Sequence, residues 1–547
     1  MRGTRWKIEG ARSPAEVIDL AVEHYSEHDA LHIPLAACAS YSPSAITLNY
    51  RELAAGMNEA AAAWAGLGLR GRVALVLENR LEFFIHWLAL NRLGNSVIPV
   101  NHELSDSEIL YCLEHGEAVA VLSLAHHTER CQRLARSVAS GPIPCLSLES
   151  PWDVGFGPAL ESIEPDLQRE CALLYTSGST GQPKGCRLSN EYFVCQGLWY
   201  RELGGYIDLR EGQERLLTPL PLSHMNAMAV SSMAMFMTGG CLVQLDRFHP
   251  ASWWQSVRES GATALHYLGV LPAILLAMPE AEEDDVGGQV RFGFGAGVNP
   301  SHHGDFEVRF GFPLIEAWAM TECGAGGAII ANEEPRHVGS CCFGKPSMAT
   351  EWQIIDKQGL EVTSGEPGEL RVRAAGDNRA LGFFSGYLKD PATTAEIWRD
   401  GWLNTGDIVR QLADGTLIFV DRLKNIIRRS GENISALEVE AAAVGLPGID
   451  TLVATAVPDE LRGDEVAVCV QVSAGATGTK ALARQIQQRV LDRLAYFKAP
   501  GWIVFSDSLP VTASNKPRRA EIKRLASEAV AAAKAHDLRA FKKRKNV

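Results

Sequence analysis

The sequence lacks the patterns that mark several classes of protein. Its 12 cysteines are scattered, apart from the neighbours Cys341 and Cys342, and none forms a CxxC motif or a Cys/His cluster with metal-ligand spacing. The apolar stretch Val73–Val100 is interrupted by charged residues, so no membrane-spanning helix is expected. The first residues lack the apolar core of a signal peptide. We therefore expect a protein of the reducing cytoplasm, without a disulfide framework.

Positive charge is also scarce. The chain has 52 lysine and arginine residues against 65 aspartate and glutamate residues, a net charge of −13, so a nucleic-acid partner is not expected. The basic run 542–545 is typical of a solvated chain end, and we give it no function. The length of 547 residues and the 46% hydrophobic content leave room for two or more folded domains.

Helix and strand signals alternate in the first third of the chain. Apolar residues at helical spacing predict a helix at 50–67, and a compact apolar run predicts a strand at 73–77. Such alternation favours right-handed crossovers and a mostly parallel sheet. The other expected helices are at 82–93, 105–114 and 251–260, and the other expected strands are at 96–100, 118–122, 241–245, 264–268 and 291–294.

The predicted fold class is α/β, with a large N-terminal domain of mostly parallel sheets flanked by helices. Short strands and turns indicate a β-rich subdomain at about 347–423 within this domain of residues 1–423. A small, mobile α+β domain is expected at 424–547, ending in an alanine-rich helix at 518–535. No Gly/Ser linker marks the boundary near Lys424, so a hinge there would act through the backbone angles of a few residues.

The segment TSGSTGQPKG at 176–185 follows an apolar strand and combines glycines with hydroxyl groups. Glycines let backbone amides converge on an oxyanion, and hydroxyls add donors, so the segment is a candidate phosphate cradle. It departs from the Walker pattern at Pro183 and Gly185, and a flexible polar turn is the alternative. The candidate residues are Thr176, Ser177, Gly178, Ser179, Thr180 and Lys184.

This segment resembles the signature loop of the adenylate-forming superfamily, which includes acyl-CoA synthetases, adenylation domains of peptide synthetases and firefly luciferase. The family's other motifs follow in order and cover nearly the whole chain, and the stretch 219–279 looks most like carnitine-type and small-acyl CoA ligases. These motifs are GAG at 295–297, WAMTE at 318–322, GYLKDP at 386–391, GWLNTGD at 401–407, DRLKNIIRRSGENISALEVE at 421–440 and SNKPRR at 514–519.

The resemblance implies an AMP-forming acid–CoA ligase with ATP, Mg²⁺ and coenzyme A as cofactors. A small carboxylic acid would be joined to AMP with release of pyrophosphate, and its acyl group would then pass to the CoA thiol. Charge that develops on the phosphates requires preorganised cations and donors. By resemblance, Thr176–Lys184 holds the β and γ phosphates, Thr321 the α phosphate and Glu322 the Mg²⁺ ion. Lys516 would bridge the acid and the α phosphate as the catalytic lysine.

Further contacts to the nucleotide and the thiol are implied in the same way. Asp407 and Arg422 would contact the ribose, and Trp318, where the family usually has tyrosine, would stack on adenine beside Gly295, Ala296 and Gly297. Asp407 could instead cap a turn, and Trp318 could simply fill the core. Domain alternation about Lys424 would then present a thiol channel made by Ser430, Gly431 and Glu432. Three departures from the family pattern have open consequences: Asn515, Pro517 and Ala436.

The acid pocket is expected between residues 222–237 and the loops at 295–298 and 318–327. His224 would gate this pocket, as in the family, although a lone histidine among apolar residues is otherwise a core group. Met225 stands where amino-acid-activating members carry aspartate, so amino acids are disfavoured, and the nearby methionines are expected to be helix core.

Two other functions remain open from the sequence. The chain could load acyl groups onto the phosphopantetheine of a carrier protein, or it could be a nucleotide-binding regulatory protein without catalysis. The identity of the acid and the oligomeric state, a homodimer included, are also open.

Overall fold

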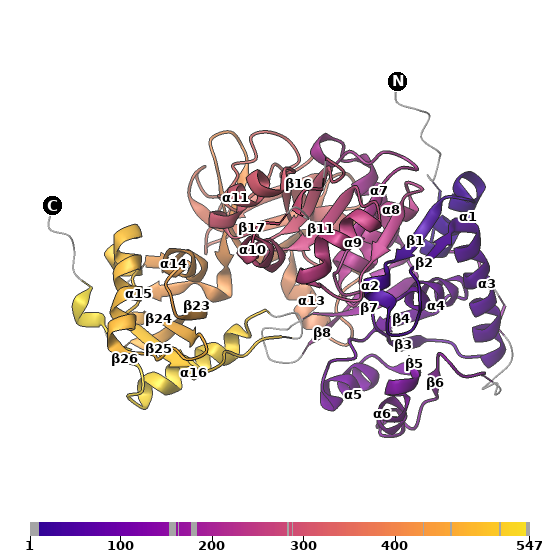
Figure 1. Ribbon diagram of the computed structural model, residues 1–547, viewed down its shortest axis with the longest axis horizontal. Coiled ribbons are helices and arrows are strands. Elements are labelled where there is room, and N and C mark those ends of the chain that lie inside the picture. Colours follow the sequence, from indigo (N-terminus) through magenta and orange to yellow (C-terminus); the bar gives the residue numbers. More distant parts are fainter. Residues whose placement is uncertain are drawn as a thin grey trace. The chain divides into compact units, whose positions relative to one another are not determined.

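The computed structural model describes residues 10–152, 160–161, 163–176, 183–281, 284–286, 288–429, 432–459, 462–512 and 516–542. The chain divides into two compact units (Figure 1). The first comprises Met1–Gly178, Gln182–Trp352 and Val372–Leu403, and the second comprises Ser179–Gly181, Gln353–Arg371 and Asn404–Val547. The domain boundary near Lys424 stays a prediction.

One sheet of the first unit has the strand order β6-β5-β3-β4-β7-β8, and its strands are parallel except β8. The central strand β3 is almost wholly buried, as a parallel sheet with helices on both faces requires. The strands are β3 (Arg72–Val76), β4 (Ser96–Pro99), β5 (Ala118–Ser123), β6 (Cys145–Ser147), β7 (Glu170–Thr176) and β8 (Lys184–Ser189), and the helices are α3 (Tyr50–Leu67), α4 (Leu81–Arg92), α5 (Asp106–His115) and α6 (Ala125–Arg136). Figure 1 shows α5 and α6 beside β5 and β6.

A second sheet of this unit has the order β14-β13-β12-β11-β9-β10-β1-β2. Its inner pairs are parallel, while the outer strands β14 and β2 are antiparallel to their neighbours. The strands are β1 (Asp29–Ile33), β2 (Ile46–Asn49), β9 (Arg215–Thr218), β10 (Cys241–Gln244), β11 (Ala264–Leu268), β12 (Phe292–Ala296), β13 (Leu314–Trp318) and β14 (Ile329–Ile330).

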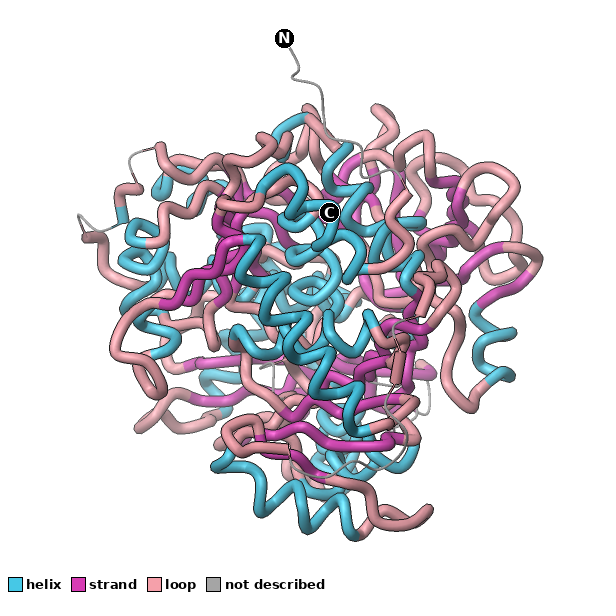
Figure 2. The backbone as a smooth tube through the Cα atoms, turned by 90° about the vertical axis from the view of Figure 1, so that its right-hand side faces the viewer, coloured by secondary structure: helices cyan, strands magenta, loops and turns pink. Residues whose placement is uncertain are grey.

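Helices alternate with these strands along the chain. Figure 2 shows the helices in cyan and the strands in magenta. The segment after β9 forms the π-helix η2 (Asn226–Ser231) and then α8 (Ser232–Phe236). The other helices around the second sheet are α1 (Pro14–Tyr25), α2 (Leu35–Cys38), α7 (Asn190–Glu202), α9 (Trp253–Glu259), α10 (Val270–Ala277), α11 (Pro300–Phe310) and α12 (Gly324–Gly327).

The expected β-rich segment is present. Its strands β17 and β19 each begin in one unit and end in the other. Within the second unit, β19 and β20 form an antiparallel pair. The elements of this segment are β15 (Cys342–Gly344), β16 (Thr350–Ile355), β17 (Pro367–Ala374), α13 (Pro391–Ile397), β18 (Trp398–Arg399), β19 (Trp402–Gln411) and β20 (Leu417–Arg422).

The end of the second unit is a mixed sheet covered by helices. Its strand order is β22-β21-β24-β25-β26, and β23 also pairs with β24. Apolar side chains from the strands and helices form one buried core on each face of β24. The elements are η5 (Leu423–Asn425), β21 (Ile427–Arg429), β22 (Glu432–Ile434), α14 (Ala436–Ala443), β23 (Ile449–Asp459), β24 (Gly463–Val472), α15 (Lys480–Arg493), β25 (Trp502–Ser506), α16 (Arg519–Ala531) and β26 (His536–Asp537).

These elements confirm the predicted α/β class, and three local predictions need correction. The helix expected at 251–260 begins as a 3-10 turn and becomes α-helical only at Trp253. The helix expected at 518–535 ends at Ala531. Lys542 is not part of a solvated end, because its ammonium lies 2.6 Å from Glu465 Oε1 and its side chain is only 2% exposed. Among the described residues, no helix is both long enough and apolar enough to span a bilayer.

Candidate functional site

The two described ends of the predicted phosphate loop are held by a strand pair of the first unit. Thr176 is the last residue of β7 and Lys184 is the first of β8, and the two residues are direct partners in the antiparallel register. Both side chains are half-buried. Ser177, Gly178, Ser179 and Thr180 lie outside the described residues. The strand pair therefore fixes where the loop begins and ends, on a rigid sheet.

Glu322 lies close to this strand pair and is held by Tyr387 of the GYLKDP motif. The Tyr387 hydroxyl donates a hydrogen bond of 2.7 Å to Glu322 Oε1, and Glu322 is 7% exposed. Burial, followed by the charge of Glu322, raises the pKa of Tyr387 above its usual value, so the phenol keeps its proton and donates to the carboxylate. The backbone of Phe384 also donates to the Glu322 carbonyl oxygen.

Tyr387 connects Glu322 to the phosphate loop. The Lys184 ammonium lies 5.2 Å from the centre of the Tyr387 ring, in cation–π range. The Thr176 hydroxyl lies 3.8 Å from the sulfur of the fully buried Cys186. Burial, and then the negative charge of Glu322, raise the pKa of the Cys186 thiol. These contacts place both ends of the loop and the predicted magnesium ligand in one cluster. Thr321, half-buried, precedes Glu322 in the turn that follows β13.

The GAG motif is fixed by an acidic residue of the neighbouring strand. Gly295 and Ala296 end β12, and Gly297 follows with a φ of 79°. Glu316 of β13 accepts hydrogen bonds from the backbone of Gly297 at 3.0 Å and of Val298 at 3.2 Å. Its Oε1 also accepts one of 2.8 Å from the Tyr267 hydroxyl. Burial raises the pKa of Glu316 even though these hydrogen bonds oppose the shift.

No side chain would fit at Gly295. A Cβ atom there would lie 2.3 Å from the carbonyl oxygen of Tyr267. The motif is thus a tightly fitted backbone segment, in which glycine is required by its neighbours.

Trp318, the last residue of β13, is 6% exposed and its ring centre lies 6.2 Å from that of Phe343. This packing fits the core-filling alternative, and the adenine contact stays a prediction. His224, by contrast, is exposed in the turn before η2, so the alternative of a core histidine is wrong at this position. Of the methionines nearby, Met228, Met233, Met235 and Met237 are fully buried, as expected.

A buried polar network lies under η2. The ring of His266 on β11 is fully buried, and its Nε2 lies 3.0 Å from the Tyr200 hydroxyl. Its Nδ1 lies 2.7 Å from the Ser231 hydroxyl and 3.0 Å from Asn226 Oδ1. The Ser231 hydroxyl donates its one proton to the backbone carbonyl oxygen of Asn226, so it accepts from His266. We therefore assign the ring proton of His266 to Nδ1 and the acceptor role to Nε2. Burial lowers the pKa of His266 to about 3, so the ring is neutral at pH 7.

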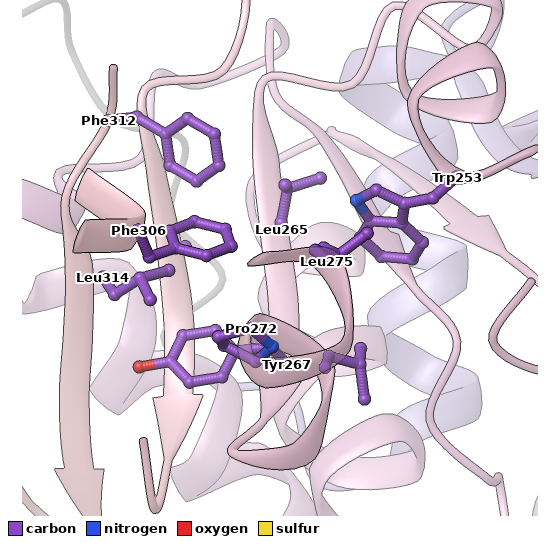
Figure 3. A pocket seen from close by; sticks show the side chains of 10 residues that line it. Trp253, Leu265, Tyr267, Pro272, Leu275, Phe306, Phe312 and Leu314 are labelled. Atoms are coloured by element: carbon purple, nitrogen blue, oxygen red, sulfur yellow. The ribbon is translucent and has the colours of Figure 1, made fainter. Parts of the chain in front are cut away.

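An apolar pocket lies on the opposite face of β11 from His266, because Leu265 and Tyr267 alternate with it along the strand (Figure 3). Strands β11, β12 and β13 and the helices α10 and α11 supply its walls. No residue of the segment 222–237 lines this pocket. It is therefore separate from the acid pocket predicted from the sequence.

In the second unit, the two predicted ribose contacts form an ion pair. Asp407 of β19 and Arg422 of β20 are partners in the antiparallel register, and Arg422 Nε lies 2.8 Å from Asp407 Oδ1. Asp407 is 1% exposed, while the side chain of Arg422 is 43% exposed. The pair presents a guanidinium at the surface above a buried carboxylate.

Lys516 lies near enough to Arg422 to feel its charge, and its backbone is hydrogen-bonded to Thr512. Its backbone donates to the Thr512 hydroxyl at 3.1 Å, and the Thr512 backbone donates to the Lys516 carbonyl oxygen at 2.8 Å. The residue as a whole is exposed. Partial desolvation, and then repulsion by the Arg422 guanidinium, lower the pKa of Lys516 from its usual value. The two cations therefore face a common region of the second unit.

The segment predicted to contain the hinge is anchored by Asp421, which is fully buried. Its Oδ2 accepts hydrogen bonds from the Ser435 hydroxyl at 2.9 Å and from the Leu437 backbone at 3.1 Å. These contacts tie the end of β20 to the start of α14. Lys424 lies in η5 and Glu432 begins β22, while Ser430 and Gly431 are outside the described residues.

Comparison with known proteins gives the family. Residues 21–388 match the AMP-binding enzyme family, and residues 438–516 match the AMP-binding enzyme C-terminal domain. The chain belongs to the AMP-binding enzyme family. This match confirms the resemblance that the motifs indicated.

Two curated relatives and one solved structure are similar over most of their length. The sulfoacetate–CoA ligase of Cupriavidus necator is 31% identical over 84% of this chain and 88% of its own. The crotonobetaine/carnitine–CoA ligase of Salmonella agona is 27% identical over 86% and 91%. The o-succinylbenzoate CoA synthetase of Bacillus subtilis, in complex with its acyl-adenylate intermediate, is 22% identical over 93% and 97%, with a TM-score of 0.79. The last likeness confirms the fold.

In this AMP-binding enzyme, the structure brings together Thr176, Lys184 and Glu322 in one unit and Asp407, Arg422 and Lys516 in the other. Three residues that organise the surroundings are not predicted from the sequence: Tyr387 at Glu322, Glu316 at the GAG motif and His266 under η2. Glu316 has a sequence signal, because it is an acidic residue inside an otherwise apolar strand. Tyr387 lies in the GYLKDP motif, which by itself gives it no role, and His266 has no signal in the sequence.

Proposed function

We propose that this AMP-binding enzyme is an ATP-dependent acid–CoA ligase and that the clustered residues described above carry its chemistry. The single observation that carries the proposal is the cluster of Thr176, Lys184 and Glu322 around Tyr387. It places a hydroxyl, a cation and a carboxylate at the two ends of a glycine-rich loop, as a triphosphate site requires.

The first half-reaction forms a mixed anhydride. A carboxylate oxygen of the acid attacks the α-phosphorus of ATP, a new P–O bond forms, and the bond to the β-phosphate oxygen breaks with release of pyrophosphate. Thr321 binds the α phosphate, and the loop from Thr176 to Lys184 binds the departing phosphates. The Lys516 ammonium offsets charge on the acid and the α phosphate as they approach each other. Lys516 is exposed and is held through its backbone, which supports a side chain that reaches a ligand.

Glu322 suits a magnesium ion, because its carboxylate is oriented by Tyr387 and offers a hard oxygen donor. When bound there, Mg²⁺ supplies positive charge next to the phosphate oxygens. The Tyr387 hydroxyl keeps the Glu322 carboxylate in one orientation by donating a hydrogen bond to it. Because the phenol stays protonated, it does not compete with Glu322 for the ion as a second anion.

The nucleoside contacts in this proposal are the ones that the family resemblance implies. Asp407 accepts from the ribose hydroxyls, and Arg422 moves from its ion pair to the ribose. Adenine stacks on Trp318 beside the backbone of Gly295, Ala296 and Gly297, which Glu316 keeps in place.

The second half-reaction passes the acyl group to CoA. The thiol sulfur attacks the carbonyl carbon of the acyl adenylate, the C–S bond forms, and AMP leaves with the oxygen of the former carboxylate. We assign Lys424 to the hinge that separates the two half-reactions, and Ser430, Gly431 and Glu432 to the thiol channel. Asp421 anchors this segment to α14.

We further propose that the acid is small and is not an amino acid. Met225 occupies the position that would hold a substrate ammonium. His224 is exposed and lies near the start of the segment that we assign to the acid pocket. The relatives named above are ligases for sulfoacetate and for carnitine-type acids. We place the protein in the cytoplasm, because all 12 cysteines are free thiols.

A screen of small carboxylic acids for pyrophosphate release from ATP, with and without CoA, tests the proposal. We expect release with a subset of acids and formation of the acyl-CoA only when CoA is present. Transfer to a phosphopantetheinyl carrier protein but not to CoA would identify a carrier-loading enzyme instead. No release with any acid would contradict the proposal and favour a regulatory nucleotide-binding protein.

A further inference from the structure

Glu78, His126 and His127 lie together at one edge of the six-stranded sheet. Glu78 follows β3, and the two histidines form the first turn of α6, directly after β5. Because β3 and β5 are parallel neighbours, their carboxyl ends meet at the same edge. The three side chains bring one ligand atom each to within 4.8 Å of one another. Among the described residues, this is the one such group of three histidine, cysteine or acidic side chains.

The distances suit a transition-metal ion. His126 Nε2 lies 3.3 Å from Glu78 Oε1. In a tetrahedral zinc site, bond lengths of about 2.0–2.2 Å place neighbouring ligand atoms about 3.3 Å apart. The His126 side chain is 58% exposed, so its ring can turn and bring the remaining ligand atoms to that spacing.

A second observation points to a ligand. The Nε2 atom of His127 is buried and has no hydrogen-bond partner among the described residues. Buried polar atoms are normally paired, and a metal ion would satisfy this nitrogen. His102, which follows β4 at the same edge, stacks on the His127 ring with centroids 5.1 Å apart and planes at 28°. This stacking holds the ring in its orientation.

The surrounding backbone is also fixed. Arg130 of α6 donates to the carbonyl oxygens of His102 and Leu104 and pairs with Asp106. Its guanidinium is therefore directed to these oxygens, and the contacts tie the loop that carries His102 to α6. The candidate ligands therefore follow the ends of β3 and β5, and His102 follows the end of β4, which lies at the same edge.

We propose that Glu78, His126 and His127 bind one transition-metal dication of the zinc class, with His102 as a positioning residue. Two imidazoles and one carboxylate are donors that zinc accepts, whereas Mg²⁺ and Ca²⁺ prefer oxygen ligands throughout. Water occupies the fourth position. The ion joins the loop after β3 to the start of α6, and this proposal is independent of the ATP chemistry. The sequence conceals the site, because Glu78 is far from the histidines along the chain.

Zinc titration of the full-length protein tests this proposal. The protein is stripped with a chelator and titrated against a chromophoric zinc indicator without ATP. We expect one equivalent to bind, and we expect His126→Ala and His127→Ala each to weaken binding at least about 100-fold, because even an outer-shell partner is worth about 10- to 100-fold. Glu78→Gln should act similarly, and His102→Ala should weaken binding about 10-fold. The matched control, His24→Ala, removes an exposed histidine at the end of α1 and should leave binding unchanged.

Two further measurements keep the result interpretable. Zinc should raise the thermal midpoint of the wild type and of His24→Ala but not of His127→Ala, and circular dichroism should show that each variant is folded. Cobalt in place of zinc should give ligand-field bands without a thiolate charge-transfer band. Failure of the wild type to bind, unchanged affinity in both histidine variants, or a thiolate band from the cysteines would each overturn the proposal. In those cases Glu78 and His126 form only a surface ion pair.

Discussion

The two units hold their candidate site residues in opposite ways. In the first unit Glu322 is 7% exposed and is fixed by a hydrogen bond from Tyr387, which also lies against Lys184. In the second unit Lys516 is exposed, and hydrogen bonds between its backbone and Thr512 hold it in place. This difference agrees with the roles proposed above. Glu322, the proposed magnesium ligand, belongs to a fixed group of side chains, whereas Lys516, proposed to act in adenylation only, is held through its backbone.

Loss of the Lys516 ammonium has the largest expected effect. Lys516→Ala should lower the rate of acyl-adenylate formation by about 100-fold or more, because a preorganised charge next to the reacting atoms is lost. Thioester formation from a supplied acyl adenylate and CoA should stay within about threefold of wild type. Pyrophosphate release measures the first half-reaction, and acyl-CoA formation measures the second. Equal losses in both would break the proposed division between the units.

Loss of the Glu322 carboxylate is expected to have the next largest effect. Glu322→Gln should lower adenylation by about 10- to 100-fold and raise the Mg²⁺ concentration needed for half-maximal rate, because the hard anionic ligand is lost. Tyr387→Phe keeps the ring against Lys184 but removes the hydroxyl, and it should cause a smaller shift, about tenfold, in the same direction. Magnesium titrations of the adenylation rate compare the variants. A Tyr387→Phe enzyme with an unchanged magnesium profile would show that the hydrogen bond does not position Glu322.

The lowered pKa of Lys516 also predicts that activity falls at alkaline pH. Its pKa is lowered from 10.5, so Lys516 loses its positive charge at a lower pH than an ordinary lysine does. Adenylation should therefore fall as pH rises through that lowered pKa. In Lys516→Arg the charge persists, because arginine stays protonated, so this limb should disappear even if the overall rate is lower. Rate profiles between pH 7 and 10 make the test, and an identical alkaline limb in both enzymes would assign it to another group.

The buried His266 of the first unit predicts an acid limit to stability. Folding lowers the pKa of His266 from 6.5 to about 3, so the unfolded chain binds more protons between these values. Its contribution to stability is complete above pH 6.5 and is lost as pH falls toward 3, by at most about 1.4 kcal/mol per pH unit. His266→Gln should flatten this slope, and the exposed His24→Gln should not. Denaturant unfolding from pH 4 to 8 provides the comparison, and parallel slopes for wild type and His266→Gln would contradict this assignment.

The sequence predicts the local elements well where one periodicity governs a segment. The helix Tyr50–Leu67 has the predicted bounds, and β3, β4 and β5 lie within about one residue of theirs. The methionine-rich segment after His224 is less predictable, because hydrogen bonds from Ser231 and His266 to Asn226 accompany a π-helix there. Apolar spacing does not report such bonds.

The site shows the same limit. Family motifs identify Thr176, Lys184 and Glu322, but the contacts that hold them join residues distant in the chain. Tyr387 and Glu322 are 65 residues apart, and no local pattern pairs them. At Lys542 the sequence pattern predicts the wrong environment. A basic run near the chain end predicts solvent exposure, but Lys542 forms a buried ion pair with Glu465. Long-range pairing of polar groups is decided by the fold, so it becomes visible only in three dimensions.

The most direct test of the account follows oxygen atoms through one turnover. An acid identified by the pyrophosphate screen is labelled with ¹⁸O in both carboxylate positions and incubated with ATP, CoA and the enzyme. We expect one labelled oxygen in the AMP and the other in the acyl-CoA carbonyl, because the carboxylate attacks the α-phosphorus and the thiol later displaces AMP. AMP without label, or label in the pyrophosphate, would contradict adenylation of the acid as the central step.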